Sequence, residues 1–254
     1  MINLHHNKLL GKPVLLVGCG PSMNDSVAKQ IMKAKINTIG VNHSFLYNDM
    51  KFYPTYHIFN DFTTDFMHVY RDVIEDIENN GSNLVIPTQV HPNYREKLKD
   101  PLLYWVAPMK DQYKFFSYDS NDEIVWFSRG QTIIFTALQL AVYLGANPIF
   151  LIGVDFTLSQ DKKLHNYDTT PLPPKVAKRL NKEVLPSRMK HLEHNAAPAL
   201  ARLGKTVFNL SKISKVDCFI KPDTSLKEAL KWLSTSRFSS IPRQPAEQQT
   251  AIQA

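Results

Sequence analysis

The chain has 254 residues and a mass of 29.1 kDa, with 43% hydrophobic, 11% aromatic and 21% charged residues. That length suits one large domain with a small lobe, and the composition excludes fibrous, collagen-like and wholly disordered proteins. The two cysteines, Cys19 and Cys218, form no CxxC pair. This argues against a disulfide framework or a cysteine-rich zinc site and favours a reducing cytoplasm.

The net charge of +7 is concentrated in one region of the chain. Between Asp161 and Asp217, 12 Lys and Arg residues stand against 5 acids, and the remaining 18 basic and 18 acidic residues balance. Such an excess suits an anionic ligand or an acidic membrane surface, or else a solvated helix face. We do not expect nucleic acid as a partner, because aromatic residues are not interleaved with the basic ones as stacking platforms.

The first part of the chain alternates short apolar runs with polar, helix-compatible segments. Between the first two runs we expect a helix from about Met23 to Lys35, and we predict strands at 13–18, 37–42, 55–61, 83–87 and 102–107. This alternation is typical of parallel crossover units. The sequence therefore predicts an α/β fold, a Rossmann-like and mostly parallel sheet with helices on both faces.

Residues 131–154 carry no charge over a length that could span a bilayer. Their middle, from Leu144 to Pro148, has the Gly-then-Pro pattern of a helix stop and precedes a short β-rich run. We therefore predict a buried helix at 131–144 and a strand at 148–154. No secretory signal is indicated at the N-terminus, so we expect a cytoplasmic protein, with peripheral contact to the inner membrane left open.

The later part of the chain changes character at residue 159. A polar, basic and proline-containing segment predicts a mobile lid or acceptor lobe, and after it we expect a helix at 187–203, the strand KTVFNL and a helix from about Ser225 to Trp232. A tail rich in Ser, Pro, Gln and Ala is predicted to be disordered. The expected organisation is an α/β domain at 1–158, the lobe at 159–186, the rest of the domain at 187–235, and the tail at 236–254.

The sharpest local motif follows the first predicted strand and reads Gly18, Cys19, Gly20, Pro21, Ser22. Its glycines would let backbone N–H groups approach an anion, and Ser22 could cap the following helix. The nicotinamide fingerprint GxGxxG is not met, and no GxxxxGK[ST] loop occurs. The pattern thus predicts a phosphate site, with a tight strand-to-helix turn as the alternative.

Polar residues also follow the next strands. Asn42 and the pair Asn60 and Asp61 end the second and third strands, and Asp155 and Thr157 follow the strand at 148–154. Ligands of open α/β sheets bind outside the carboxyl ends of the strands, so these side chains are expected to share one crevice. Neutral amides suit a base, ribose or sugar hydroxyl, although ordinary Asx turns would also explain them.

A second anion cradle is predicted where the helix at 131–144 begins, at Gly130, Gln131 and Thr132, although helix capping alone would explain a Thr there. His191 and His194 lie three residues apart on one helical face, which leaves open a metal pair, a solvated role and an acid/base role. No DxD pair of carboxylates is present to hold a cation on a diphosphate. We therefore expect no metal.

In this order the motifs resemble those of the bacterial sialyltransferases of glycosyltransferase family 42. They also resemble the related domain that motility-associated flagellin glycosyltransferases share with an archaeal hydroxymethylpterin pyrophosphokinase (MptE-like). The resemblance spans most of residues 13–220 through GCGPS (18–22), GVNHSF (40–45), FND (59–61), LGANPIFLIGVDF (144–156) and VFNLSKISKVDCF (207–219). It implies a GT-A-like variant of the Rossmann-like fold with a small basic lid.

The sialyltransferase resemblance implies metal-independent, inverting transfer of a nonulosonic acid from a CMP-sugar to a surface glycan, lipid-linked glycan or protein. It places the donor at Gly20, Ser22, Asn42 and Asn60. His191, eight residues before Ala199-Leu200, is implied as the catalytic base. The expected lid or phosphate contacts are Lys162, Lys163, His165, Tyr167 and Arg188. Lipopolysaccharide or capsule synthesis is the setting that such an activity implies, with self-association left open.

Two positions depart from the sialyltransferase pattern. Thr157 stands where tyrosines are usual after the GxDF strand, and Cys19 replaces the customary Asn. Both bring the chain nearer to the flagellin and pterin branch. An ATP- and Mg-dependent pyrophosphokinase, with Asp61 and Asp155 as the only acids placed to bind the metal, is therefore the alternative, together with a nucleotide-binding module without turnover.

Overall fold

The protein is described from a computed structural model. The described residues are 2–44, 46–47, 50–59, 74–89, 98–99, 101–107, 114–115, 126–159, 164–165 and 173–235. The expected disordered tail at 236–254, and most of the lid segment before residue 173, lie outside them. The domain boundaries therefore stay a prediction.

A sheet of eight strands forms the centre of the molecule, in the order β10-β9-β1-β2-β5-β6-β7-β8. All of its strand pairs are parallel. The Rossmann-like α/β prediction is thus confirmed. The strands are β1 (Val14–Val17), β2 (Thr38–Val41), β5 (Tyr56–Ile58), β6 (Asn83–Pro87), β7 (Leu102–Val106), β8 (Trp126–Phe127), β9 (Ile149–Ile152) and β10 (Val207–Asn209).

Smaller elements lie outside this sheet. A 3₁₀ turn, η1 (Ile2–His5), begins the described chain, and β3 (Leu46–Tyr47) pairs antiparallel with β4 (Met50–Lys51). The sequence pattern indicated neither of them, nor the two-residue β8, because elements this short carry no hydrophobic period. The predicted strand at 83–87, in contrast, is confirmed residue for residue as β6.

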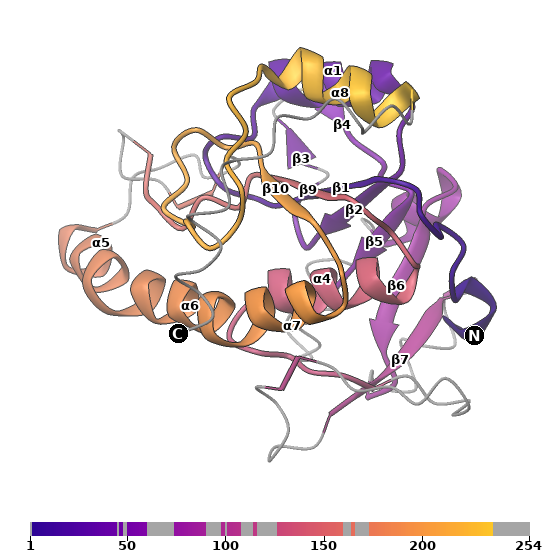
Figure 1. Ribbon diagram of the computed structural model, residues 1–254, viewed down its shortest axis with the longest axis horizontal. Coiled ribbons are helices and arrows are strands. Elements are labelled where there is room, and N and C mark those ends of the chain that lie inside the picture. Colours follow the sequence, from indigo (N-terminus) through magenta and orange to yellow (C-terminus); the bar gives the residue numbers. More distant parts are fainter. Residues whose placement is uncertain are drawn as a thin grey trace.

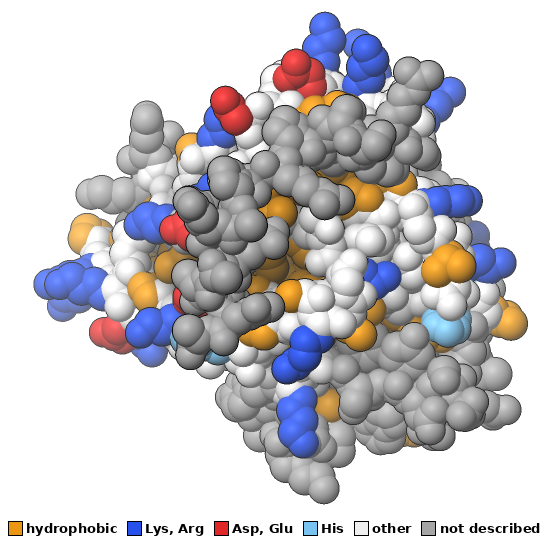
Figure 2. Space-filling view, in the orientation of Figure 1, with side chains coloured by type: hydrophobic (Ala, Val, Ile, Leu, Met, Phe, Trp, Pro, Cys, Tyr) orange, Lys and Arg blue, Asp and Glu red, His pale blue; other side chains and the backbone are white. Residues whose placement is uncertain are grey.

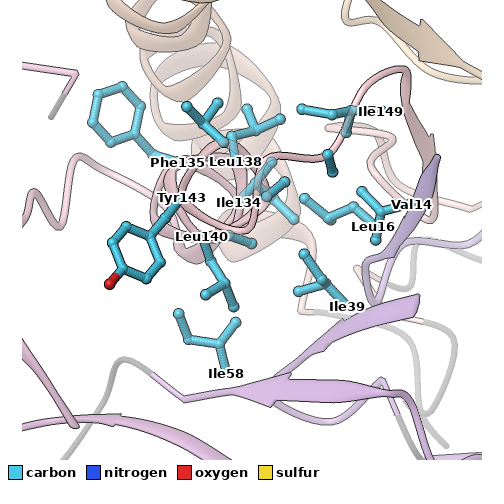
Figure 3. Close-up of a cluster of buried hydrophobic side chains, with 14 of the residues drawn as sticks. Val14, Leu16, Ile39, Ile58, Ile134, Phe135, Leu138, Leu140, Tyr143 and Ile149 are labelled. Atoms are coloured by element: carbon cyan, nitrogen blue, oxygen red, sulfur yellow. The ribbon is translucent and has the colours of Figure 1, made fainter. Parts of the chain in front are cut away.

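Helices cover both faces of the sheet, which explains why β1 and β9 are apolar at every position. On one face Leu15 and Val17 of β1 pack with α1 (Asp25–Ala34) and α8 (Leu226–Thr235), as Figure 1 shows. On the other face Val14 and Leu16 pack against α4 (Ile133–Tyr143) (Figure 3). Almost every residue of α4 is buried, so this uncharged helix is a core element.

The uncharged segment at 131–154 therefore folds as predicted, into a helix, a turn and a strand of the core. In the described part of the chain, no helix combines the length and the apolar character needed to cross a membrane. The turn lies at the end of α4 that is remote from its N-cap, Thr132. It consequently places the N-terminus of α4 beside the carboxyl ends of the strands.

The longest helical stretch runs from Pro174 to Arg202 and contains two π-helical turns. Its parts are α5 (Pro174–Arg179), η3 (Leu180–Val184), α6 (Leu185–His191), η4 (Leu192–Ala196) and α7 (Ala197–Arg202). Pro186 and Pro198 each follow a π turn by two residues, and the wider turn accommodates a residue that lacks an N–H and would clash with the preceding turn. The helix expected only from residue 187 thus begins at Pro174.

Candidate functional site

The strand order reverses beside β1. From β1 the sheet extends through β2 to β8 on one side, and β9 and β10 then return to its other side. The loops after β1 and β9 therefore leave the sheet in opposite directions and open a crevice at their carboxyl ends. A cavity of about 450 Å³ lies there, within the range of roughly 300–1,000 Å³ that is usual for small-molecule sites.

Most of the predicted site residues that the structure describes line this cavity. They are Cys19, Gly20, Asn42, Gly130, Gln131, Thr132, Asp155, Thr157, His165 and Arg188. Gly18, Pro21, Ser22 and His191 do not line it, although all belong to elements that border it. Asn60, Asp61, Lys162, Lys163 and Tyr167 lie outside the described residues.

A buried carboxylate joins the loops after β1, β9 and β10. Asp155 is 1% exposed. Its Oδ2 accepts a hydrogen bond from the Ser22 backbone N–H at 2.7 Å, and its Oδ1 accepts from the hydroxyls of Ser22, at 2.7 Å, and Ser211. The Ser22 hydroxyl oxygen in turn accepts from the Gly153 N–H at 3.0 Å. Asp155 therefore holds the rim of the crevice together.

The hydrogen bonds to Asp155 give Ser22 another role than the one expected from the sequence. We expected Ser22 to cap α1, but the N-cap is Asn24, whose side chain accepts from the Val27 N–H at 3.1 Å. Gly20 needs to be glycine because a Cβ would lie 2.8 Å from the Gly153 carbonyl oxygen and would overlap the Asp155 carboxylate. The glycine motif thus serves close packing of two loops, while Cys19 and Gly20 still face the cavity.

The opposite wall of the cavity is suited to an anion. The N-terminus of α4 points into it, with Thr132 as N-cap accepting from the Ile134 N–H at 3.4 Å. Arg129, exposed, and Arg188, half-buried on α6, line the same wall. Burial lowers the pKa of Arg188 from its usual value, but a guanidinium stays protonated in proteins. Two cations and the positive end of a helix together favour a negatively charged ligand.

Asn42 lies at the end of β2 and lines the same cavity. Its φ of 43° is in the left-handed region, and its backbone carbonyl accepts a hydrogen bond from Nε2 of His57 at 2.7 Å. His57 is fully buried, and burial lowers its pKa to about 3. This imidazole is therefore neutral at physiological pH.

His191 lies behind Gly130, at the start of α4. It is 6% exposed, its ring packs on Phe135 with centroids 4.5 Å apart, and a Cβ on Gly130 would lie 2.7 Å from its Nε2. The Asn195 side-chain nitrogen lies 3.1 Å from both the His191 carbonyl oxygen and Nδ1. Since the carbonyl can only accept, this nitrogen is the amide NH₂ and Nδ1 is an acceptor.

The neutral imidazole of His191 consequently carries its proton on Nε2, the nitrogen that faces Gly130. Burial lowers the pKa of His191, which keeps the ring neutral at physiological pH. Such a ring donates a hydrogen bond at Nε2, whereas a general base would need a lone pair there.

Three residues of this site were not among our sequence predictions. Arg129 adjoins the predicted cradle, and the charge next to a helix start was the available signal. Asn195 lies four residues after His191, one turn along the same helical face, and could have been found from that spacing. His57 is a lone polar residue inside a buried strand, which by itself indicates only a satisfied core histidine.

A diphosphokinase would use a magnesium ion, and among the described acids Asp155 is the one expected to bind it. The three hydrogen bonds to Asp155 use three of the roughly four lone-pair sites of its carboxylate, so one site, on Oδ2, is left for a metal. Among the described residues, no group of three or more His, Cys, Asp and Glu side chains is placed to hold a metal. The described residues therefore do not form a magnesium site.

The fold and the crevice define a doubly wound α/β domain with a small-molecule site at the topological switch point. The chain belongs to the MptE-like family: residues 1–161 match the family model described as "6-hydroxymethylpterin diphosphokinase MptE-like". Among curated proteins, none matches the chain.

A solved structure shares the fold. The MAf glycosyltransferase from Magnetospirillum magneticum AMB-1 superposes with a TM-score of 0.54 at 17% identity, over 91% of this chain and 38% of that one. The present chain thus spans well under half the length of that protein. A short-chain dehydrogenase from Oenococcus oeni PSU-1, with a TM-score of 0.23 at 9% identity over 92% and 94% of the two chains, carries no argument.

Proposed function

We propose that this protein is a glycosyltransferase that takes a nucleotide-activated sugar, with a CMP-linked nonulosonic acid as donor and a glycan, lipid-linked glycan or protein as acceptor. The observation that carries the proposal is the polarity of the cavity. Arg129, Arg188 and the N-terminus of α4 form a cationic wall, and Asn42 adds a neutral amide to the lining of the same cavity. A phosphate beside a nucleoside has this distribution of charge.

The same wall would stabilise the reaction. When the bond between the sugar and the nucleotide phosphate breaks, negative charge develops on the phosphate oxygens. Fixed donors aimed at that charge lower the barrier without reorganising during the reaction. Arg188 and the amides at the start of α4 are such donors. The fold shared with the MAf glycosyltransferase supports this class of reaction.

We further propose that His191 serves this wall as a hydrogen-bond donor. The resemblance to sialyltransferases implied a base at this position, but the Asn195 amide favours the tautomer with the proton on Nε2. That N–H lies against Gly130, which lines the cavity. It can hold the Gly130 loop or an anion that reaches it.

Nucleotide binding tests the proposal directly. Thermal unfolding would be followed with CMP, CDP, UDP, ATP and S-adenosylmethionine, each with and without magnesium, since a ligand of the native state raises Tm. We expect CMP or CDP to give the largest rise without metal. Arg188→Met should remove most of that rise, whereas Lys190→Met, exposed on the same helix, should leave it unchanged. If no nucleotide raises Tm, the proposal fails.

The alternative is an ATP-dependent diphosphokinase, which the description of the family model favours. It would require magnesium, because the metal neutralises the transferred phosphates. A preference for ATP with magnesium, lost on chelation, would favour this alternative. Binding of CMP without any turnover in the presence of acceptors would instead indicate a nucleotide-binding module.

A basic surface beside the site suggests where an anionic acceptor would lie. Lys and Arg side chains gather at the α5 end of the molecule (Figure 2), where exposed Lys175, Lys178, Arg179 and Lys182 outnumber Glu183. We propose that the protein acts in the cytoplasm and meets phosphates of a membrane or of a lipid-linked glycan there. Co-sedimentation with anionic vesicles, weakened by salt and by Lys175→Gln/Lys178→Gln, is the expected result. Equal sedimentation of the variant would contradict it.

A further inference from the structure

His57 is a buried imidazole whose hydrogen-bond direction is fixed by its partner. Its Nε2 lies 2.7 Å from the backbone carbonyl oxygen of Asn42. A carbonyl only accepts, so Nε2 carries the proton. The ring stacks on Phe59 with centroids 4.6 Å apart, and the Asn42 N–H donates to the Ile58 carbonyl at 3.1 Å. Both backbone polar groups of Asn42 are therefore tied to the end of β5.

These two hydrogen bonds hold Asn42 in a costly conformation. Its φ of 43° lies in the left-handed region, where glycine would be unstrained and Asn is only tolerated. The side chain adds a second cost, because Oδ1 is buried and has no hydrogen-bond partner within the part of the chain that the structure describes. A buried acceptor without a partner destabilises the folded state. Asn42 also lines the cavity.

We infer that His57 is a positioning residue of this site: it fixes Asn42 so that Oδ1 stands ready to accept a hydrogen bond from a donor group of the bound nucleoside. The inference rests on the proposed nucleotide site. The stored cost is offset when the ligand supplies the missing N–H or O–H.

An acceptor at this place selects for ligands with a donor. Cytidine offers two kinds, the ribose hydroxyls and the exocyclic amine of the base. Asn42 follows β2, which is where doubly wound folds place the group that contacts a ribose hydroxyl. A ligand that presents a carbonyl or only hydrogen at this point leaves Oδ1 unpaired, and sites built around a hydrogen bond reject such analogues strongly.

The test measures Kd for CMP, UMP, 2′-deoxy-CMP and 3′-deoxy-CMP with the wild-type protein. At least one analogue should bind about tenfold more weakly than CMP. A deoxy analogue identifies the ribose as the source of the donor, and UMP identifies the cytosine amine. Equal affinity for all four overturns the inference and leaves the proposed nucleotide site standing.

Two variants then separate positioning from stability. His57→Gln keeps an N–H in place of Nε2–H and should retain the preference for CMP over the disfavoured analogue. His57→Phe removes the donor, keeps the ring that stacks on Phe59, and should reduce that preference to within about threefold. Should His57→Phe fail to fold, His57→Leu takes its place. A full preference in the donor-less variant overturns the inference, and a protein that binds none of the four nucleotides overturns the proposed function as well.

Discussion

Two buried histidines each contact a residue that lines the cavity, His57 at Asn42 and His191 at Gly130. Each is held by an asparagine, but the direction of the hydrogen bond differs. On β5, His57 donates its Nε2–H to the backbone carbonyl of Asn42. On α6, His191 accepts at Nδ1 from the side-chain amide of Asn195. Burial lowers the pKa of both rings, so both are neutral at physiological pH.

The difference lies in where each proton is directed. The N–H of His57 donates a hydrogen bond to a backbone carbonyl within the protein, whereas the N–H of His191 faces Gly130, a residue that lines the cavity. A histidine near a site is therefore not a base by position alone. The hydrogen bond to its second nitrogen decides whether the first one donates or accepts.

Substitutions of His191 should have the largest effect on activity. We expect His191→Leu to lower kcat/KM by about 10²–10³, the usual loss when a donor to developing charge is removed. His191→Gln places an amide N–H near the Nε2 position and should keep activity within about tenfold of wild type. Steady-state kinetics with a CMP-sugar donor would measure both.

The pair of variants distinguishes a donor from a base. An amide cannot remove a proton, so a base at His191 predicts that Gln and Leu lose activity equally, by about 10²–10⁴. Equal losses would thus contradict the donor role. Wild-type circular dichroism and Tm in both variants would control for unfolding.

The fold was largely predictable from sequence because buried parallel strands are short, mostly apolar runs. β6 and the α4-β9 pair were identified from such runs and from the Gly and Pro between them. The start of the long helix at Pro174 was not, because prolines that normally stop helices are here accommodated by π turns. That accommodation depends on tertiary packing, which the sequence pattern does not report.

The site was predictable in place but not in detail. Asn42, Asp155 and Thr157 were predicted because each follows a strand, and the carboxyl ends of parallel strands share one edge of the sheet. The role of Ser22 was not predictable, because its partner Asp155 is 133 residues away in sequence. The same holds for His57, whose partner is the backbone of another strand's loop. Long-range hydrogen bonds leave no local signal.

Acidification should act mainly through His57. Burial first, with His43 as a smaller contribution, lowers its pKa from 6.5 to about 3. In the unfolded chain His57 therefore binds a proton near pH 6.5, whereas in the folded chain it stays neutral until about pH 3. The contribution of neutral His57 to the free energy of unfolding is complete above pH 6.5 and is lost as the pH falls towards 3. Between pH 7 and 5 we expect a loss of about 2 kcal/mol from this group. His191 shifts in the same direction.

Urea unfolding of wild type and His57→Gln at both pH values would measure this loss. The variant should be less sensitive to acid by about 2 kcal/mol, whatever its stability at pH 7. An identical dependence on pH in the two proteins would show that His57 is not the group responsible.

Replacing the amide that holds His191 should have an intermediate effect. In Asn195→Asp a carboxylate would accept from Nδ1–H, raise the pKa of His191 and leave a lone pair on Nε2 once the ring is neutral. Activity should then fall by about tenfold as pH rises through that raised pKa, while wild type shows no such fall. If the variant instead becomes faster at high pH, His191 is a base and our donor role is wrong. Asn195→Leu is the uncharged control.

The smallest expected effect concerns the pair His57 and Asn42. It tests whether Asn42 destabilises the protein in the absence of its ligand. Asn42→Gly relieves the left-handed backbone and removes the unpaired Oδ1, gains that the flexibility of glycine in the unfolded chain partly opposes. A net stabilisation of about 1 kcal/mol, or about 2–4 °C in Tm, is expected. His43→Gly, one residue along and outside the left-handed region, should destabilise the protein. Nucleotide affinity should meanwhile fall in Asn42→Gly. The side chain that lowers the stability of the ligand-free protein would then be the one that binds the ligand.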